Sequence, residues 1–322
     1  MNEVGDLLAG RYRLESRMSA NGPWFATDEH AQRPVVIERL AARSEDQARQ
    51  WAPRGDRTAT RVEHPNIVAV HETLPDGGAS AVVMEYFPSR SLAGLLAERG
   101  SLPVEEAATI GAQVAAALAA AQDAGVVHGA VEPSAVLLGS SGVAKVTDFA
   151  SRDDVAEAPA YLAPEVARGN APTAASDVFS LGATLHAALE GNPPFGLGTD
   201  NPLAVLHEAA AGVVPPAPHA GRAAPILARM MHEDPAARPR PQQVRDSLRA
   251  LLDGRPVPTH FPLSEDLTQP MPAVPATPAQ HDSSTEAPEP PASDSAVRRF
   301  TRYSPLLLAA AITVVVVLIL TL

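Results

Sequence analysis

Two short stretches carry most of the residues whose types and spacing suit chemistry. Residues 126–138 read VVHGAVEPSAVLL, and VTDFA follows at 146–150. In the second stretch, Asp148 offers a carboxylate, the kind of oxygen ligand that divalent metal ions prefer. The centre of the first stretch holds Ala130, Glu132 and Ala135. These residues give one candidate metal ligand and leave the middle of the loop without an acid at position 130.

The segments that must position these residues divide the first 252 residues into two parts. Up to residue 87, short β-prone runs alternate with Gly, Pro and Asp turns, namely YRLES, PWFAT, PVVIERL, IVAVHETL and SAVVMEYF. After residue 100, Ser101 and Pro103 mark the start of a helix and Gly125 marks its end. Further helices are predicted at 176–190, 202–211, 222–232 and 241–252. A β-rich small lobe followed by a helical large lobe is an α+β architecture.

The composition changes twice beyond residue 252. Residues 253–297 contain ten prolines, seven acidic residues and one basic residue, which predicts a disordered tether over 253–303. Residues 305–322 carry no charge and would span about 27 Å as a helix. Three arginines precede them, at positions 298, 299 and 302. We therefore expect a transmembrane helix at 304–322, with the N-terminal part on the cytoplasmic side of a cell membrane.

Bulk composition excludes several functional classes. The net charge is −12, which argues against a nucleic-acid surface because such surfaces are basic. The chain has no cysteine, so disulfides, thiolate metal sites and a cysteine nucleophile are excluded. The first ten residues, MNEVGDLLAG, lack the basic and apolar regions of a secretory signal.

Seven motifs occur in the order and at the spacings found in one known family. They are HPNIV (64–68), VMEYF (83–87), HGAVEPSAVLL (128–138), VTDFA (146–150), PAYLAPE (159–165), SDVFSLGATLHAALEGNPPF (176–195) and DPAARP (234–239). Together they resemble the bacterial eukaryotic-like Ser/Thr protein kinases. The resemblance implies a protein-kinase-like bilobal fold, with an N-lobe at 11–87 and a C-lobe at 88–252.

The resemblance also implies which residues keep the fold. Glu165 and Arg238 match the buried ion pair of the large lobe. Asp177 matches a residue that braces the catalytic loop from beneath. His128 and Phe149 match two positions of the apolar spine that joins the lobes. Each of these residues is expected to be structural.

The positions that carry chemistry in this family are changed. Phosphoryl transfer needs a phosphate-binding lysine, metal-holding Asp and Asn residues and a base for the hydroxyl. By the resemblance, Glu38 stands for that lysine and Gly55 for its partner glutamate. In the loop, the base, the following lysine and the metal-binding asparagine correspond to Ala130, Glu132 and Ala135. No substitute lysine is expected either, because Lys145 is the only lysine of the chain and is predicted to be a solvated strand residue.

These changes predict a catalytically inactive, membrane-anchored pseudokinase that serves as a signalling or scaffold protein. It would be no enzyme and would need neither ATP nor Mg²⁺, with Asp148 as a relic metal ligand. Its expected partners are the membrane, an active Ser/Thr kinase or a phosphothreonine-binding FHA-type protein, and Thr268 and Thr277 are the candidate phosphoacceptors. Two alternatives remain: an atypical or weak ATP-dependent Ser/Thr kinase or other transferase, and a mere spacer for membrane insertion.

Overall fold

The computed structural model describes residues 3–18, 22–40, 62–76, 79–149, 159–199 and 201–256. The chain divides into two units, Met1–Ala273 and Val274–Leu322, and the described residues all belong to the first unit. Across these described ranges, no helix is both long enough and apolar enough to cross a membrane. Gly55, Thr268, Thr277 and the predicted membrane span at 304–322 lie outside the described residues.

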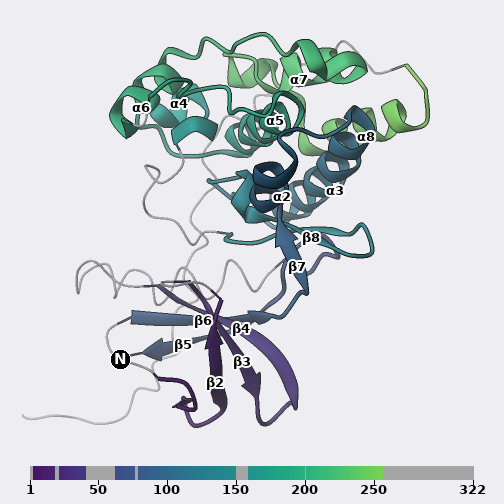
Figure 1. Cartoon of the computed structure of the whole chain (residues 1–322). Helices are drawn as coiled ribbons and strands as arrows, with labels where there is room; N and C mark the ends of the chain where they lie inside the picture. Colours follow the sequence, from purple (N-terminus) through teal and green to yellow (C-terminus); the bar gives the residue numbers. More distant parts are fainter. Residues whose placement is uncertain are drawn as a thin grey trace, which may run out of the picture. The chain divides into compact units, whose positions relative to one another are not determined.

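A six-stranded antiparallel sheet forms the first part of the chain (Figure 1). Its strands are β1 (Leu7–Leu8), β2 (Tyr12–Arg17), β3 (Trp24–Asp28), β4 (Arg33–Leu40), β5 (Val70–Asp76) and β6 (Ala79–Glu85). They are hydrogen-bonded in the order β1-β2-β3-β4-β6-β5. Alternate side chains point into a small core because successive residues of a strand face opposite sides. The core residues include Tyr12, Leu14, Trp24, Ala26, Val35, Ile37, Ala81 and Val83.

The second part is mostly helical. Its helices are α2 (Leu92–Arg99), α3 (Val104–Asp123), α4 (Pro164–Ala167), α5 (Ala174–Glu190), α6 (Pro202–Ala211), α7 (Ala224–Met230) and α8 (Pro241–Leu252). A small sheet is formed by β7 (Ser89–Ser91), β8 (Val136–Gly139) and β9 (Ala144–Val146), in that order. Single 3₁₀ turns are η1 (Pro133–Ala135), η3 (Pro159–Tyr161), η4 (Pro218–Ala223) and η5 (Pro235–Ala237).

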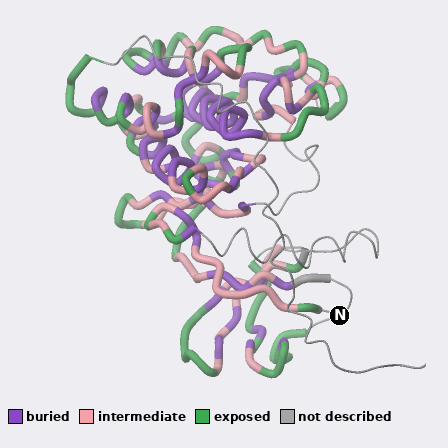
Figure 2. Tube along the Cα trace, turned by 180° about the vertical axis from the view of Figure 1, so that it is seen from behind, coloured by how far each residue is buried: buried purple, intermediate pink, exposed green. Residues whose placement is uncertain are grey.

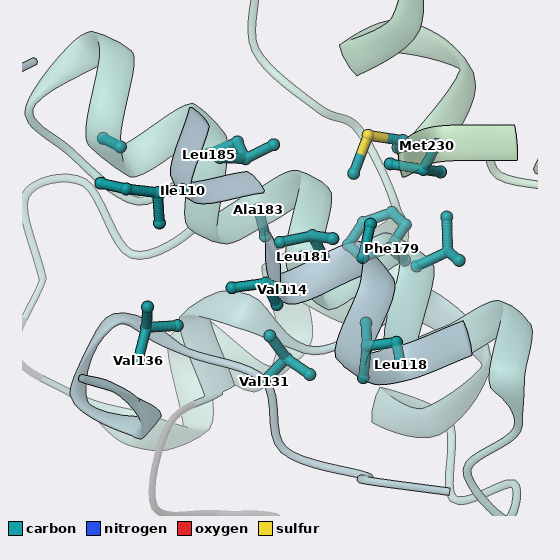
Figure 3. Close-up of a cluster of buried hydrophobic side chains, with 14 of the residues drawn as sticks. Ile110, Val114, Leu118, Val131, Val136, Phe179, Leu181, Ala183, Leu185 and Met230 are labelled. Atoms are coloured by element: carbon teal, nitrogen blue, oxygen red, sulfur yellow. The ribbon is translucent and has the colours of Figure 1, made fainter. Parts of the chain in front are cut away.

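Helices α3 and α5 form the centre of this helical part. Both contain many alanines, the residue with the highest intrinsic helix propensity. Sixteen of the residues of α5 are buried, and most of them are apolar, as expected for a helix in the centre of a core. Figure 2 shows this continuous buried region, and Figure 3 shows its side chains from Ile110 and Val114 of α3 to Phe179 and Leu185 of α5.

Close helix packing is set by a glycine in α5. A Cβ atom added at Gly182 would lie 2.7 Å from the Cγ atom of Met231, which is too close for two carbon atoms. Thr173 begins the same helix with a capping box, in which its side chain accepts from the Ser176 amide and Ser176 accepts from the Thr173 amide. The packed helix therefore provides a fixed platform for the residue at its first turn, Asp177.

The predicted strands and the helices near 104–123, 176–190, 202–211, 224–230 and 241–252 are confirmed. The α+β class is likewise confirmed for the described residues. Helix α2 is missing from the sequence-based interpretation, although Ser91 caps its start and Gly100 its end. Its eight residues give too few turns for a clear helical periodicity.

Candidate functional site

The loop after α3 is fixed by one buried carboxylate, that of Asp177. Asp177 accepts hydrogen bonds from the backbone N–H groups of His128 and Gly129, both at 2.8 Å. Burial raises the pKa of the Asp177 carboxyl to about 7, although the two N–H donors oppose that rise. Gly129 has φ = 83°, a conformation that favours glycine. The carboxylate and the glycine together fix the path of the backbone into residue 130.

His128 connects this loop to the stretch that contains Asp148. Its Nε2 atom lies 2.8 Å from the carbonyl oxygen of Thr147, and its Nδ1 atom accepts from the Ala130 amide at 3.2 Å. Both bonds are satisfied when the ring proton is on Nε2. The His128 ring also packs on Phe149, with ring centroids 4.6 Å apart. His128 thus positions the residues on both sides of Asp148.

Asp148 has a backbone conformation that is unusual for a residue with a side chain. Its φ is 65°, in the left-handed region, where Asp is better tolerated than most residues. The Thr147 hydroxyl donates to Asp148 Oδ1 at 3.2 Å. Within the described ranges, no group of three or more His, Cys, Asp or Glu side chains is arranged to hold a metal ion. Among the described residues, Asp148 is therefore a candidate ligand that belongs to no such cluster.

The strand before Asp148 is anchored by a contact that the sequence-based interpretation lacks. Asn66 donates to the carbonyl oxygen of Ala144 at 2.8 Å and to Gln113 Oε1 at 3.0 Å. The backbone of the same segment pairs with Val146, which donates to Asn66 O at 2.8 Å. Asn66 belongs to the HPNIV motif, but the motif does not show which distant backbone group its side chain contacts, because that depends on how the segments pack.

The middle of the loop contains two alanines and one buried acid. Ala130 is half-buried and Ala135 is fully buried, so neither offers a group for acid–base or metal chemistry. Glu132 is 8% exposed and accepts a hydrogen bond from Ser134 Oγ. Burial, reinforced by the nearby Glu132 carboxylate, raises the pKa of Tyr161 to about 12. The ionisable side chain in the middle of this loop is therefore Glu132, whose carboxylate is bonded to Ser134.

Strand β4 carries Glu38, and the single lysine of the chain lies elsewhere. Glu38 is half-buried and its backbone lies opposite Val82 of β6. The prediction that Lys145 is solvated is wrong: its side chain is 16% exposed and forms an ion pair with Glu85. Its Nζ atom also lies 5.3 Å from the centre of the Phe87 ring. The half-buried Glu85 carboxylate and the Phe87 ring together stabilise the Lys145 ammonium group in this partly buried position.

Glu165 and Arg238 form a bidentate ion pair in the helical part. Arg238 Nη1 and Nη2 lie 2.6 and 2.8 Å from the two carboxylate oxygens of Glu165. Arg238 also donates to the carbonyl oxygens of Ala175, His232 and Glu233. Its side chain is fully buried, and its guanidinium group stacks over Phe179. These contacts place the segment before α5 against the segment before α8.

The family model of the protein kinase domain matches residues 25–248. The chain belongs to the protein kinase family. Among its relatives, serine/threonine-protein kinase PkaA of Streptomyces coelicolor is 32% identical over 213 residues, which are 60% of this chain and 38% of the relative. Serine/threonine-protein kinase PknA of Mycobacterium tuberculosis is 32% identical over 213 residues, which are 60% of this chain and 49% of the relative.

A shorter match has the higher identity. Serine/threonine-protein kinase PknK of Mycobacterium tuberculosis is 39% identical over 143 residues, or 41% of this chain and 13% of the relative. The chain thus spans less than half the length of each of these three relatives. The predicted resemblance to bacterial Ser/Thr kinases is confirmed at the level of the family and its relatives.

Two predictions from the sequence are overturned by these findings. The chain was expected to be no enzyme, whereas its family and its relatives, which are named kinases, point to an enzyme. It was expected to use no cofactor, whereas protein kinases transfer a phosphoryl group from ATP with the help of Mg²⁺. Substitution of single catalytic side chains lowers a rate but does not by itself show that a domain is inactive.

The described residues fit ATP and Mg²⁺ only in part. Asp148 supplies a carboxylate of the kind that binds Mg²⁺, but Ala135 offers no second ligand. Glu38 is predicted to stand where the family places a lysine, and a negative charge there would repel phosphates. These residues do not reproduce the usual phosphate-binding arrangement, so no catalytic step is assigned to a nucleotide in that pose.

Proposed function

We propose that this chain is an atypical Ser/Thr protein kinase that transfers a phosphoryl group slowly and binds ATP in a pose other than the usual one. The observation that carries the proposal is the intact support around Asp148. Asp177 holds the loop, His128 holds Thr147, and Asn66 holds the strand before Asp148. A scaffold arranged in this way keeps one metal-binding carboxylate in a fixed position, which is what phosphoryl transfer requires of it.

The same residues explain why the transfer should be slow. A positioned general base contributes typically about 10²–10⁴-fold to a rate, and position 130 is an alanine. We therefore expect rates about 10²–10⁴-fold below those of a relative with an aspartate at that position. The role of the chain's own residues is to orient the Asp148 carboxylate and to exclude water from the core beneath it.

The experiment is a phosphoryl-transfer assay on the full chain. Purified protein is incubated with γ-labelled ATP, Mg²⁺ or Mn²⁺ and a general acceptor protein, and phosphorylated residues are identified by mass spectrometry. Asp148→Ala should abolish the label, whereas Asp253→Ala should leave it unchanged, because Asp253 is exposed and pairs only locally with Arg255. A signal that is equal in the wild-type chain and Asp148→Ala, or absent from both at high enzyme concentration, rules out the proposed activity.

The proposed place of action is the cytoplasmic face of a cell membrane. Support comes from sequence: residues 305–322 are uncharged, and three arginines precede them, a pattern that favours a span with its N-terminal side in the cytoplasm. Alkaline extraction of membranes should leave the full chain in the pellet and release a chain that ends at residue 303. Release of both chains would contradict the anchor.

The proposed partners are proteins that contact the segment between the kinase domain and this span. Thr268 and Thr277 are candidate phosphoacceptors there, for this kinase or for a more active one. A phosphothreonine-binding FHA-type protein is the proposed reader, since phosphopeptide readers use arginine clusters. Binding of such a module should require phosphate at one of the two threonines and disappear in the Thr268→Ala, Thr277→Ala double variant.

A further inference from the structure

A cavity of about 570 Å³ lies between the small sheet and helices α2 and α3. Its apolar lining comes from Pro88, Leu95, Ile110 and Leu138. Glu106 and Arg90 are its charged lining residues. The volume falls in the range of about 300–1,000 Å³ that is typical of ligand pockets. The cavity is separate from the candidate site, because Ala130, Ala135 and Asp148 do not line it.

Two exposed ion pairs border this cavity. Arg90 pairs with Glu98 at 2.8 Å, and Arg99 pairs with Glu106 at 2.9 Å. The four side chains are between 37% and 68% exposed. Exposed pairs of this kind contribute little to stability, because water screens the two charges. Either guanidinium group can therefore turn to a carboxylate of an incoming peptide at little cost in free energy.

The described chain ends close to this cavity. Arg222 donates to the carbonyl oxygen of Leu251 at 3.3 Å and to Glu105 at 3.0 Å. Leu251 is in the last turn of α8, and Glu105 precedes the cavity-lining Glu106 in α3. The chain thus leaves α8 beside the first turn of α3. At about 3.3–3.6 Å per residue, the next ten residues can easily reach Thr109 on the cavity wall.

The segment that follows has the composition of a docking peptide. Residues 257–267 read VPTHFPLSEDL. Between 257 and 297, Phe261 is the single aromatic residue, and Leu263 and Leu267 are the two leucines. Two acids, Glu265 and Asp266, lie between those leucines. This combination of large apolar and acidic side chains matches a cavity with an apolar wall and two arginines at its border.

We propose that residues 260–267, HFPLSEDL, dock into this cavity of the same molecule. Phe261 and Leu263 fill the apolar part, and the two acids pair with Arg90 and Arg99. Burial of these two apolar side chains favours docking, and the short connection gives a local concentration in the millimolar range. The proposal is independent of phosphoryl transfer, and it ties the start of the tether to the kinase domain.

Disulfide trapping in the full chain tests this proposal directly, because the natural sequence has no cysteine. Thr109 lies exposed on the cavity wall, so Thr109→Cys is combined with Leu263→Cys. The control pair is His219→Cys with Leu263→Cys, because His219 is 73% exposed and belongs to the same 3₁₀ turn as Arg222, beside the chain exit. Mild oxidation is followed by non-reducing gel electrophoresis and peptide mapping.

The docked segment should give an intramolecular disulfide at position 109 at least about tenfold faster than at position 219, since a disulfide needs Cα atoms within about 7 Å. Adding Phe261→Ala should reduce the rate at 109 to that of the control, and a synthetic HFPLSEDL peptide should slow disulfide formation in the Thr109→Cys, Leu263→Cys variant. Equal rates at 109 and 219 would overturn the proposal, as would a rate unaffected by Phe261→Ala. Disulfides formed mainly between two molecules would assign the cavity to a second copy instead.

Discussion

Two carboxylates, Asp148 and Glu38, bear on the proposed binding of ATP. The backbone of Asp148 has a left-handed conformation, and its side-chain carboxylate is a candidate metal ligand. Glu38, by contrast, brings a negative charge to the position where kinases place a phosphate-binding lysine. The two carboxylates should therefore act in opposite ways on ATP: Asp148 would attract a metal ion, and Glu38 would repel phosphates placed in the usual kinase position.

Reversing the charge at Glu38 should strengthen ATP binding. Two unit charges 4 Å apart near a protein surface interact by about 4 kcal/mol, and desolvation offsets much of that gain. We therefore expect Glu38→Lys to lower the Kd for ATP by about tenfold or more, as measured by calorimetry with Mg²⁺ present. The Kd for ATP of Glu38→Gln, which only removes the charge, should lie between that of the wild-type chain and that of Glu38→Lys. If Lys and Gln at this position give the same Kd, residue 38 does not face the phosphates.

Ion pairs between segments hold the elements in place. Arg238 is fully buried and uses five hydrogen bonds to join Glu165, the first turns of α5 and the segment before α8. In the sheet, Asp28 plays a similar part at the end of β3. It accepts two hydrogen bonds from Arg11 and two from the backbone N–H groups of His30 and Ala31.

Removing the charge of Arg238 should strongly destabilise the helical part. Arg238→Met leaves the Glu165 carboxylate without its partner, and breaking a buried pair in this way typically costs about 3–5 kcal/mol. Urea unfolding followed by circular dichroism measures the change. Arg168→Met is the matched control, because Arg168 is 46% exposed and lies 3.4 Å from Glu233. Similar losses in both variants would show that burial adds nothing to the Arg238 pair.

The sheet should lose stability in acid because of Asp28. Hydrogen bonds from Arg11 and from two backbone N–H groups hold the pKa of Asp28 well below its usual range. Below about pH 4 the unfolded chain takes up a proton that the folded chain does not, so the unfolding free energy falls as the pH falls further. Urea midpoints followed by Trp24 fluorescence should drop between about pH 5 and pH 2. The drop should be smaller in Asp28→Asn and unchanged in Asp253→Asn.

At the scale of the whole described molecule, the two sheets are joined by the single lysine of the chain. Lys145 belongs to β9 of the small sheet, and its partner Glu85 ends β6 of the six-stranded sheet. The backbone of Ile67 also bridges to Val146 of β9. The strand that leads to Asp148 is therefore attached to both parts of the kinase domain.

Lys145→Met should loosen this connection more than it destabilises either part. The pair is 16% and 27% exposed, so its loss should cost about 1–2 kcal/mol, between the values for exposed and buried pairs. Hydrogen exchange should become faster at the end of β6 and in β9. Arg13→Met, which breaks the more exposed Arg13–Glu29 pair, should leave both segments unchanged. Uniform faster exchange across the chain would instead indicate global destabilisation.

The sequence by itself determined the class of fold, most of the helices and strands, and the residues at each motif position. It could do so because strand alternation, helix caps and motif spacing are local properties of the chain. The sequence did not predict helix α2, because eight residues are too few to show a clear helical periodicity.

Only the tertiary structure decided where those residues meet. Lys145 pairs with Glu85 sixty residues away, and Asn66 bonds the backbone next to Asp148. Neither contact can be read from local sequence, because each depends on how distant segments pack. The same holds for the cavity between the small sheet, α2 and α3, whose wall is assembled from segments up to fifty-four residues apart, from Pro88 to Gly142. Local sequence patterns therefore predicted the helices and strands, whereas long-range packing determined which groups surround each functional side chain.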